Sequence, residues 1–202
     1  MKIVSLVEDA KDDFEKHLHY IADNHSYVVI KDKTDLINAP LYAIPYKLKD
    51  IHELRISETS LRTLDNIPDE LHELFLYKCN GLTHIDLSKV SIAKDFQLHT
   101  SRGVESIILP NLLGGLGSFI LIEQCLKIHK ISSHTGTVQK LTVKDCKSIN
   151  SLTCIDVSNI INLNLEGTNN ITHFDKNNIS ADTTLIHCDN IKSFRGVEDV
   201  DI

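Results

Sequence analysis

The sequence predicts an α/β solenoid dominated by one parallel β-sheet, and an internal repeat carries this prediction. Segments such as LFLYKCNGLTHI (74–85), ILIEQCLKIHKI (120–131) and LTVKDCKSINSL (141–152) share one spacing. Copies begin at residues 54, 74, 96, 120, 141, 163 and 183, and the first of these is one residue short. A period of 20–24 residues is typical of solenoids, in which each repeat buries its apolar face against its neighbours.

Four positions of the repeat are apolar. Counted from the first residue of each copy, positions 1, 3, 9 and 12 are apolar in 27 of 28 cases, Thr183 being the exception. The alternation at positions 1 and 3 predicts a short strand that points both side chains into a core. Stacking of these strands, one per copy, predicts the parallel sheet.

Position 6 always carries a small side chain with a weakly polar group. A hydroxyl or thiol can bond buried backbone groups where the chain leaves the strand, and it occupies little volume. We therefore expect a structural ladder inside the core, and not a metal site or a catalytic thiol, because no histidine recurs beside it. The ladder consists of Thr59, Cys79, Ser101, Cys125, Cys146, Thr168 and Cys188.

With an apolar residue three positions upstream, as at Ile51 or Leu71, the unit reads L-x-x-L-x-L-x-x-C-x-x-L. This unit resembles the cysteine-type variant of the leucine-rich repeat family, over about seven copies in residues 51–194. The resemblance implies a leucine-rich-repeat horseshoe. Its convex segments, such as DLSKVSIA (86–93), are too short for helices, so extended or 3₁₀ stretches are expected. A right-handed parallel β-helix is the alternative; it is disfavoured because no second strand pattern recurs.

The two ends of the chain are expected to cap the solenoid. In residues 1–50, Ser5 and Glu8 form a capping-box pair, and an amphipathic pattern predicts a helix from about 7 to 23. The stretch VVIKDKTDLINA (28–39) is a candidate eighth, degenerate copy, and residues 38–50 with two prolines form a connection. Residues 195–202 predict a short polar C-terminal cap.

Composition restricts the class of protein. The 202 residues are 42% hydrophobic and carry a formal net charge of −7. No apolar run approaches the roughly 18 residues of a membrane span, and no basic stripe is present for a phosphate backbone, so neither membrane nor nucleic acid is expected as a partner. Five cysteines without a CxxC pair, and no recognisable signal peptide, favour reduced thiols and a cytoplasmic location.

Signals for enzymatic chemistry are weak. The stretch LLGGLG (112–117) lacks the lysine of a phosphate loop, and the histidines of HLHY (17–20) point to different sides of a helix. We expect no cofactor, no metal site and no catalytic residue. An excess of Lys over Arg, 17 against 4, suggests an AT-rich genome such as that of a phage or an intracellular bacterium.

The exposed face of the predicted sheet carries the candidate site. Positions 0, 2 and 4 should point outward, and aromatic or apolar side chains gather there in the second to fourth copies. We refer to these residues as the apolar patch: Phe75, Tyr77, His99, Phe119 and Leu121. Lys140, Lys144 and Glu166, further along the face, are expected to contribute little.

The apolar patch predicts a non-enzymatic protein-binding module that sequesters, inhibits or tethers a protein partner, in one version a host protein bound by a phage or pathogen factor. Two alternatives stay open. One is a β-helix protein that binds or cleaves glycans, with Tyr77, Glu123 and Glu166 as candidate residues. The other is a structural subunit of a larger assembly. The sequence leaves the oligomeric state open.

Overall fold

The structure is a computed structural model of the chain. It describes residues 51–59, 61–113, 118–133, 138–150, 154–155, 160–168 and 170. It also describes the backbone of five further strands, at 4–7, 27–31, 173–175, 182–186 and 193–195. In these parts of the chain the fold is a parallel β-solenoid, and no helix occurs among them.

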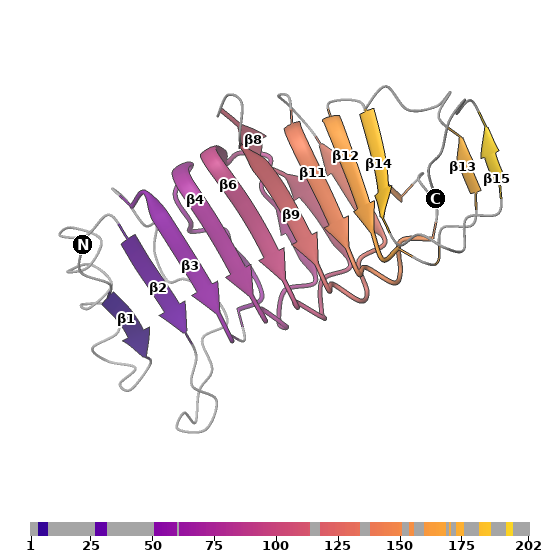
Figure 1. Cartoon of the computed structure of the whole chain (residues 1–202). Helices are drawn as coiled ribbons and strands as arrows, with labels where there is room; N and C mark the ends of the chain where they lie inside the picture. Colours follow the sequence, from indigo (N-terminus) through magenta and orange to yellow (C-terminus); the bar gives the residue numbers. More distant parts are fainter. Residues whose placement is uncertain are drawn as a thin grey trace.

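The main element is a long parallel sheet of ten strands in the order β1-β2-β3-β4-β6-β9-β11-β12-β14, with the short β8 beside β6 (Figure 1). Its strands are β1 (Val4–Val7), β2 (Tyr27–Lys31), β3 (Glu53–Ser57), β4 (Glu70–Tyr77), β6 (Ser91–His99), β8 (Asn111–Leu112), β9 (Phe119–Glu123), β11 (Val138–Lys144), β12 (Ile160–Glu166) and β14 (Asp182–Ile186). Position 1 of each predicted copy pairs with position 1 of the next, from Leu54 opposite Leu74 to Leu163 opposite Thr183. The register predicted from the sequence is therefore the register of the sheet.

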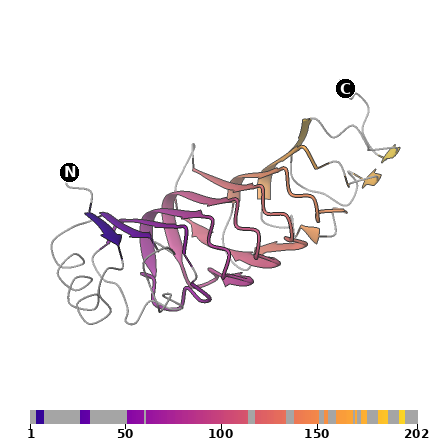
Figure 2. The ribbon, with the colours of Figure 1, turned by 90° about the horizontal axis from the view of Figure 1, so that it is seen from below.

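A second parallel sheet lies across the solenoid from the first. It contains β5 (His84–Asp86), β7 (Ser106–Leu109) and β10 (Lys130–Ser133), and a further pair joins β13 (His173–Asp175) to β15 (Ser193–Arg195). Ile107, at position 12, pairs with Ile85 and Ile131 at the same position. Seen from below in Figure 2, the chain passes from the long sheet to the short one in successive turns.

The second sheet corrects one expectation. The extended segments between the copies were expected, but the view that no second strand recurs is wrong, because positions 11–13 form a strand in five copies. The described strands of this sheet are three or four residues long and bury one or two side chains each, too few for a clear alternation in the sequence. A parallel β-helix is therefore no longer disfavoured.

The long sheet continues toward the N-terminus. Val28 pairs with Leu54, so the candidate eighth copy does place a strand in the register of the others. Val4 pairs with Val28 in turn, which adds a strand that was not predicted. Ser5 lies inside β1 and therefore cannot be the N-cap of a helix that begins after it. Residues 8–26, which hold most of the predicted helix, lie outside the described residues, as do residues 196–202 of the predicted C-terminal cap.

The core lies between the two sheets and is almost entirely aliphatic. Positions 1 and 3 are fully buried in each described copy, and Phe96 is the largest side chain among them. In the third copy the upstream apolar place is taken by Ile92, whereas Ala93 is exposed, because the pairing of β4 with β6 shifts between Leu71 and Glu73. In the described part of the chain, no helix could span a membrane.

Each turn out of the long sheet uses a left-handed backbone at position 5. The φ angle there is between 50° and 61° in six successive copies, and glycine occupies only the last of them, Gly167. The backbone N–H at position 5 donates to the position 4 carbonyl of the next copy, as from Thr100 to Glu123 (2.9 Å) and from Gln124 to Lys144 (2.9 Å). This bond holds the turn against the cost of positive φ, which is about 1–2 kcal/mol for residues other than glycine.

Thr100→Gly is expected to raise the free energy of unfolding by roughly 0.5–1 kcal/mol. Thr100 is β-branched and has φ near 50°, so glycine relieves more strain than it adds in unfolded-state entropy. The matched control is Lys127→Gly, because Lys127 is exposed and has no positive φ. It should cost about 0.5–1 kcal/mol. Urea unfolding measures both, and a loss of stability in Thr100→Gly would contradict the turn geometry.

Candidate functional site

The ladder at position 6 lies inside the solenoid in every described copy. Thr59 and Ser101 are buried, and so are the thiols of Cys79, Cys125 and Cys146. Thr168 is fully buried as well, whereas Cys188 lies outside the described residues. The described ladder side chains therefore belong to the interior and not to a surface that could meet a partner.

The ladder side chains bond the backbone of two adjacent copies. The Cys79 thiol donates to the carbonyls of Ile56 (3.5 Å) and Tyr77 (3.7 Å). The Ser101 hydroxyl donates to His99 O (3.1 Å) and accepts the backbone N–H of Cys79 (3.1 Å). The carbonyls of Tyr77 and His99 also accept the position 5 N–H of the preceding copy, so the rung adds a second bond to each of them. The Ser101 hydroxyl gives the buried N–H of Cys79 its partner.

The described ladder thiols differ in their pKa: it is raised for Cys79 and Cys146, and lowered for Cys125, chiefly by its hydrogen bond with Cys146. Burial raises the pKa of the Cys79 thiol to about 12. The pKa of Cys146 is also raised, first by its hydrogen bond with Cys125 and then by burial. A thiol with a raised pKa stays protonated near neutral pH, and the thiolate is the form that attacks electrophiles or binds metal.

Brief alkylation of the folded protein should modify Cys154 and spare Cys79, Cys125 and Cys146, because the last three side chains are fully buried. Cys154 is only half-buried, and its Sγ lies 3.6 Å from Asn150 Oδ1, so reagent can approach it. Mass spectrometry of iodoacetamide-treated protein, with and without denaturant, measures the result. Rapid labelling of the three ladder cysteines in native buffer would contradict their inward placement.

The apolar patch lies on the outer face of the long sheet and is half-buried throughout. The rings of Phe75 and Tyr77 stack with centroids 6.4 Å apart, and the His99 ring lies 5.2 Å from Phe75. The Arg55 guanidinium lies 5.4 Å from the Phe75 ring centroid, and the Lys78 ammonium lies 4.9 Å from that of Tyr77. Phe75, Tyr77 and His99 thus form one cluster of rings, with a cation near Phe75 and another near Tyr77.

A chain of polar groups runs across the ends of four neighbouring strands. His99 Nδ1 lies 2.9 Å from a Glu123 oxygen, and its Nε2 lies 3.2 Å from Gln97 Oε1. The Lys144 ammonium lies 3.9 Å from Glu123 and 3.0 Å from Glu166. The Lys144 pKa is raised, chiefly by its hydrogen bond to Glu166. This chain links the aromatic cluster to the far part of the face.

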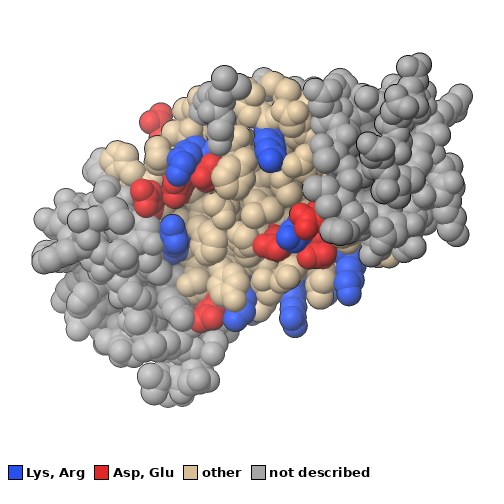
Figure 3. Space-filling view, viewed as in Figure 1, with Lys and Arg blue, Asp and Glu red and all other residues tan. Residues whose placement is uncertain are grey.

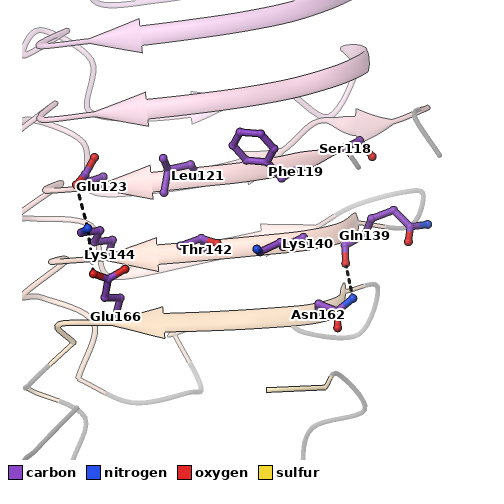
Figure 4. A pocket seen from close by; sticks show the side chains of 10 residues that line it. All are labelled: Ser118, Phe119, Leu121, Glu123, Gln139, Lys140, Thr142, Lys144, Asn162 and Glu166. Atoms are coloured by element: carbon purple, nitrogen blue, oxygen red, sulfur yellow. Dashed lines mark hydrogen bonds and ion pairs between the residues drawn. The ribbon is translucent and has the colours of Figure 1, made fainter. Parts of the chain in front are cut away.

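A hollow of about 590 Å³ opens over β9, β11 and β12 (Figure 4). Phe119 and Leu121 stand on one side of it, and the smaller Thr142 lies between two lysines on the middle strand. The hollow is lined by Ser118, Phe119, Leu121, Glu123, Gln139, Lys140, Thr142, Lys144, Asn162 and Glu166. Three residues of the apolar patch belong to β4 and β6 and form the ring cluster, and the other two, Phe119 and Leu121, form a wall of this hollow.

Three charged residues share the hollow with the apolar patch. Lys140, Lys144 and Glu166 line it together with Phe119 and Leu121. That they contribute little to partner binding stays a prediction. The sequence signal for the hollow was present, since Thr142 is much smaller than Leu121 at position 2 of the preceding copy. It was missed because a change of side-chain size between adjacent strands matters only once the strands are known to be neighbours.

Two of the three candidate residues for glycan chemistry lie together at the hollow, and the third lies outside it. Glu123 and Glu166 share the Lys144 ammonium at the hollow, whereas Tyr77 stacks on Phe75 outside it. In the part of the chain that the structure describes, no group of three or more His, Cys, Asp or Glu side chains could hold a metal ion. His17, His19 and His25 lie outside that part.

The chain was compared with protein-family models, with curated proteins and with solved structures, and none of the three comparisons found a match.

Proposed function

We propose that this protein is a non-enzymatic protein-binding module that sequesters, inhibits or tethers a protein partner through the outer face of its long sheet. The observation that supports this proposal is the apolar patch, whose five side chains are half-buried on the outer face although the core lies on the other side of the sheet. Large apolar side chains that remain partly exposed on a regular surface mark interaction sites.

The distribution of charge around the apolar patch is typical of a surface that binds another protein. Figure 3 shows the middle of this face largely without charge, and Lys, Arg, Asp and Glu side chains lie around it. An apolar centre with a polar rim is the usual anatomy of a protein–protein interface. The strands beneath are hydrogen-bonded on both sides, so the backbone has little freedom to lose on binding.

The composition adds a proposal about the partner. The excess of Lys over Arg suggests a gene from an AT-rich genome, such as that of a phage or an intracellular bacterium. For a gene of that origin, we propose that the partner is a host protein in the cytoplasm. Both signs of charge occur around the patch, a pattern that does not suit the uniformly negative backbone of a nucleic acid.

A comparison of captured proteins tests the proposed function. The wild-type chain and the Phe75→Ser/Phe119→Ser variant are immobilised and exposed to cytosol from candidate hosts, and bound proteins are identified by mass spectrometry. The control is Leu113→Ser, since Leu113 is also exposed but lies outside the patch. A protein retained by the wild type and the control but lost by the double variant is expected. Identical profiles for all three would overturn the proposal.

We further propose that the solenoid is a cysteine-type leucine-rich repeat. The position 6 ladder supports this, because its thiols bond the carbonyls at positions 3 and 4 in successive copies, as at Cys79 and Cys146. The second parallel sheet favours a β-helix instead. A crystal structure distinguishes the two, since a horseshoe would place the long sheet along a curved inner side and a β-helix would keep it straight.

A further inference from the structure

The hollow over β9, β11 and β12 is electrically polarised along the strands. Where β11 begins, the Lys140 ammonium is exposed and makes no ion pair with any described residue. Where β9, β11 and β12 end, the carboxylates of Glu123 and Glu166 flank the single ammonium of Lys144. One end of the hollow therefore offers a cation, and the other end offers two carboxylates that share one ammonium, with the His99 ring 2.9 Å from Glu123.

The middle of the hollow is apolar on one side and open above Thr142. Phe119 and Leu121 stand beside it at positions 0 and 2 of their strand, and Thr142 occupies position 2 of the next strand. Positions 0 to 4 span about 13 Å of strand, at about 3.3 Å per residue. A ligand that fills the hollow therefore meets a cation, an apolar wall and an acidic pair in this order.

We propose that this hollow binds an extended peptide segment of the protein partner, with an acidic, an apolar and a basic side chain on one face of the segment. The inference rests on the proposed function and specifies the partner chemistry. In an extended chain, residues i, i+2 and i+4 point to the same side, so their spacing matches positions 0, 2 and 4 beneath them. The acidic residue lies at Lys140, the apolar residue against Phe119 and Leu121, and the basic residue at Glu123 and Glu166.

Charge complementarity selects this occupant over a neutral glycan. A glycan without charge would leave the Lys140 ammonium without a counter-ion, and it would not use the two carboxylates at the other end. A segment with both charges uses each end of the hollow. Complementary potentials of this kind set orientation and exclude wrong partners more than they raise affinity.

The test uses short peptides blocked at both ends and the isotope-labelled full-length chain, observed by NMR at millimolar peptide. The probes are Glu-Ser-Leu-Ser-Lys and its reverse, together with versions that carry two glutamates, two lysines, or serine in place of leucine. One of the two mixed-charge probes is expected to shift the amides of Leu121 and Thr142. The like-charge probes and the probe without leucine are expected to bind about tenfold more weakly.

Lys140→Glu is expected to weaken the mixed-charge probe by about tenfold, because it replaces the attractive charge with a repulsive one. The control is Lys147→Glu, which changes the same charge at an exposed lysine outside this hollow and should leave the affinity unchanged. Equal binding of all probes, no binding of either mixed-charge probe, or no effect of Lys140→Glu would overturn the inference. Stronger shifts from a neutral oligosaccharide at the same amides would overturn it in favour of a glycan.

The capture experiment distinguishes a failure of the peptide proposal from a failure of the proposed protein-binding function. If the probes fail while the Phe75→Ser/Phe119→Ser variant still loses a captured protein, the proposed function stands and only the peptide chemistry is wrong. If the probes fail and the capture profiles are identical as well, both proposals are wrong.

Discussion

Cys146→Leu is expected to lower the free energy of unfolding by about 3 kcal/mol, because it overfills a tight interior turn and removes a donor. The Cys146 side chain is fully buried, and its Sγ donates to the carbonyls of Lys144 (3.4 Å) and Ile122 (3.7 Å). Leucine adds volume where Cys125 of the preceding rung leaves no room, and it leaves both carbonyls without this donor.

Cys146→Ser is the paired variant and should cost no more than about 1 kcal/mol. Ser101 already occupies the same position two copies earlier, where its hydroxyl donates to His99 O at 3.1 Å. Cys154→Leu is a control away from the ladder, because Cys154 is only half-buried, and should stay within about 1 kcal/mol of the wild type. Thermal and urea unfolding measure all three. Equal, negligible losses for both Cys146 variants would show that the ladder is not tightly packed.

Phe75→Ser and Phe119→Ser together are expected to weaken binding of the captured partner by roughly 2–4 kcal/mol. Binding energy concentrates in a few large side chains near the centre of an interface. The Phe75 ring contacts both Tyr77 and His99, and the Phe119 ring lines the hollow. Folding should persist, because both side chains are half-buried on the face opposite the core. Calorimetric titration and a thermal melt separate binding from folding.

The controls for this variant must lie outside the hollow. Lys140, Lys144 and Glu166 line it together with Phe119, so they are unsuitable. Lys147 and Leu113 are exposed elsewhere, and replacing either should change the binding free energy by less than about 1 kcal/mol. Unchanged affinity in the double variant, or a loss of equal size in the controls, would show that the apolar patch is not the centre of an interface.

The sequence by itself determined the register of the long sheet and the direction of its side chains. Leu74, Leu76 and Cys79 are buried as predicted, and Phe75 and Tyr77 stand on the opposite face. This was possible because alternation along a strand is a local property, and because a turn into a packed core restricts the size of the residue at position 6 in every copy. Seven copies of the same requirement made the pattern visible.

Other features were decided only by the tertiary structure. The described strands of the second sheet bury only one or two side chains each, such as Ile107 and Leu109 in β7, so neighbouring copies and not a local pattern define it. The left-handed turn at position 5 carries Glu, Lys, Thr and Gln in four copies, residues that rarely adopt positive φ, and the hydrogen bond to the next copy holds it there. The polarised hollow depends on side chains from three strands that are about 20 residues apart in sequence and about 4.8 Å apart in space. Only folding brings their sizes and charges together.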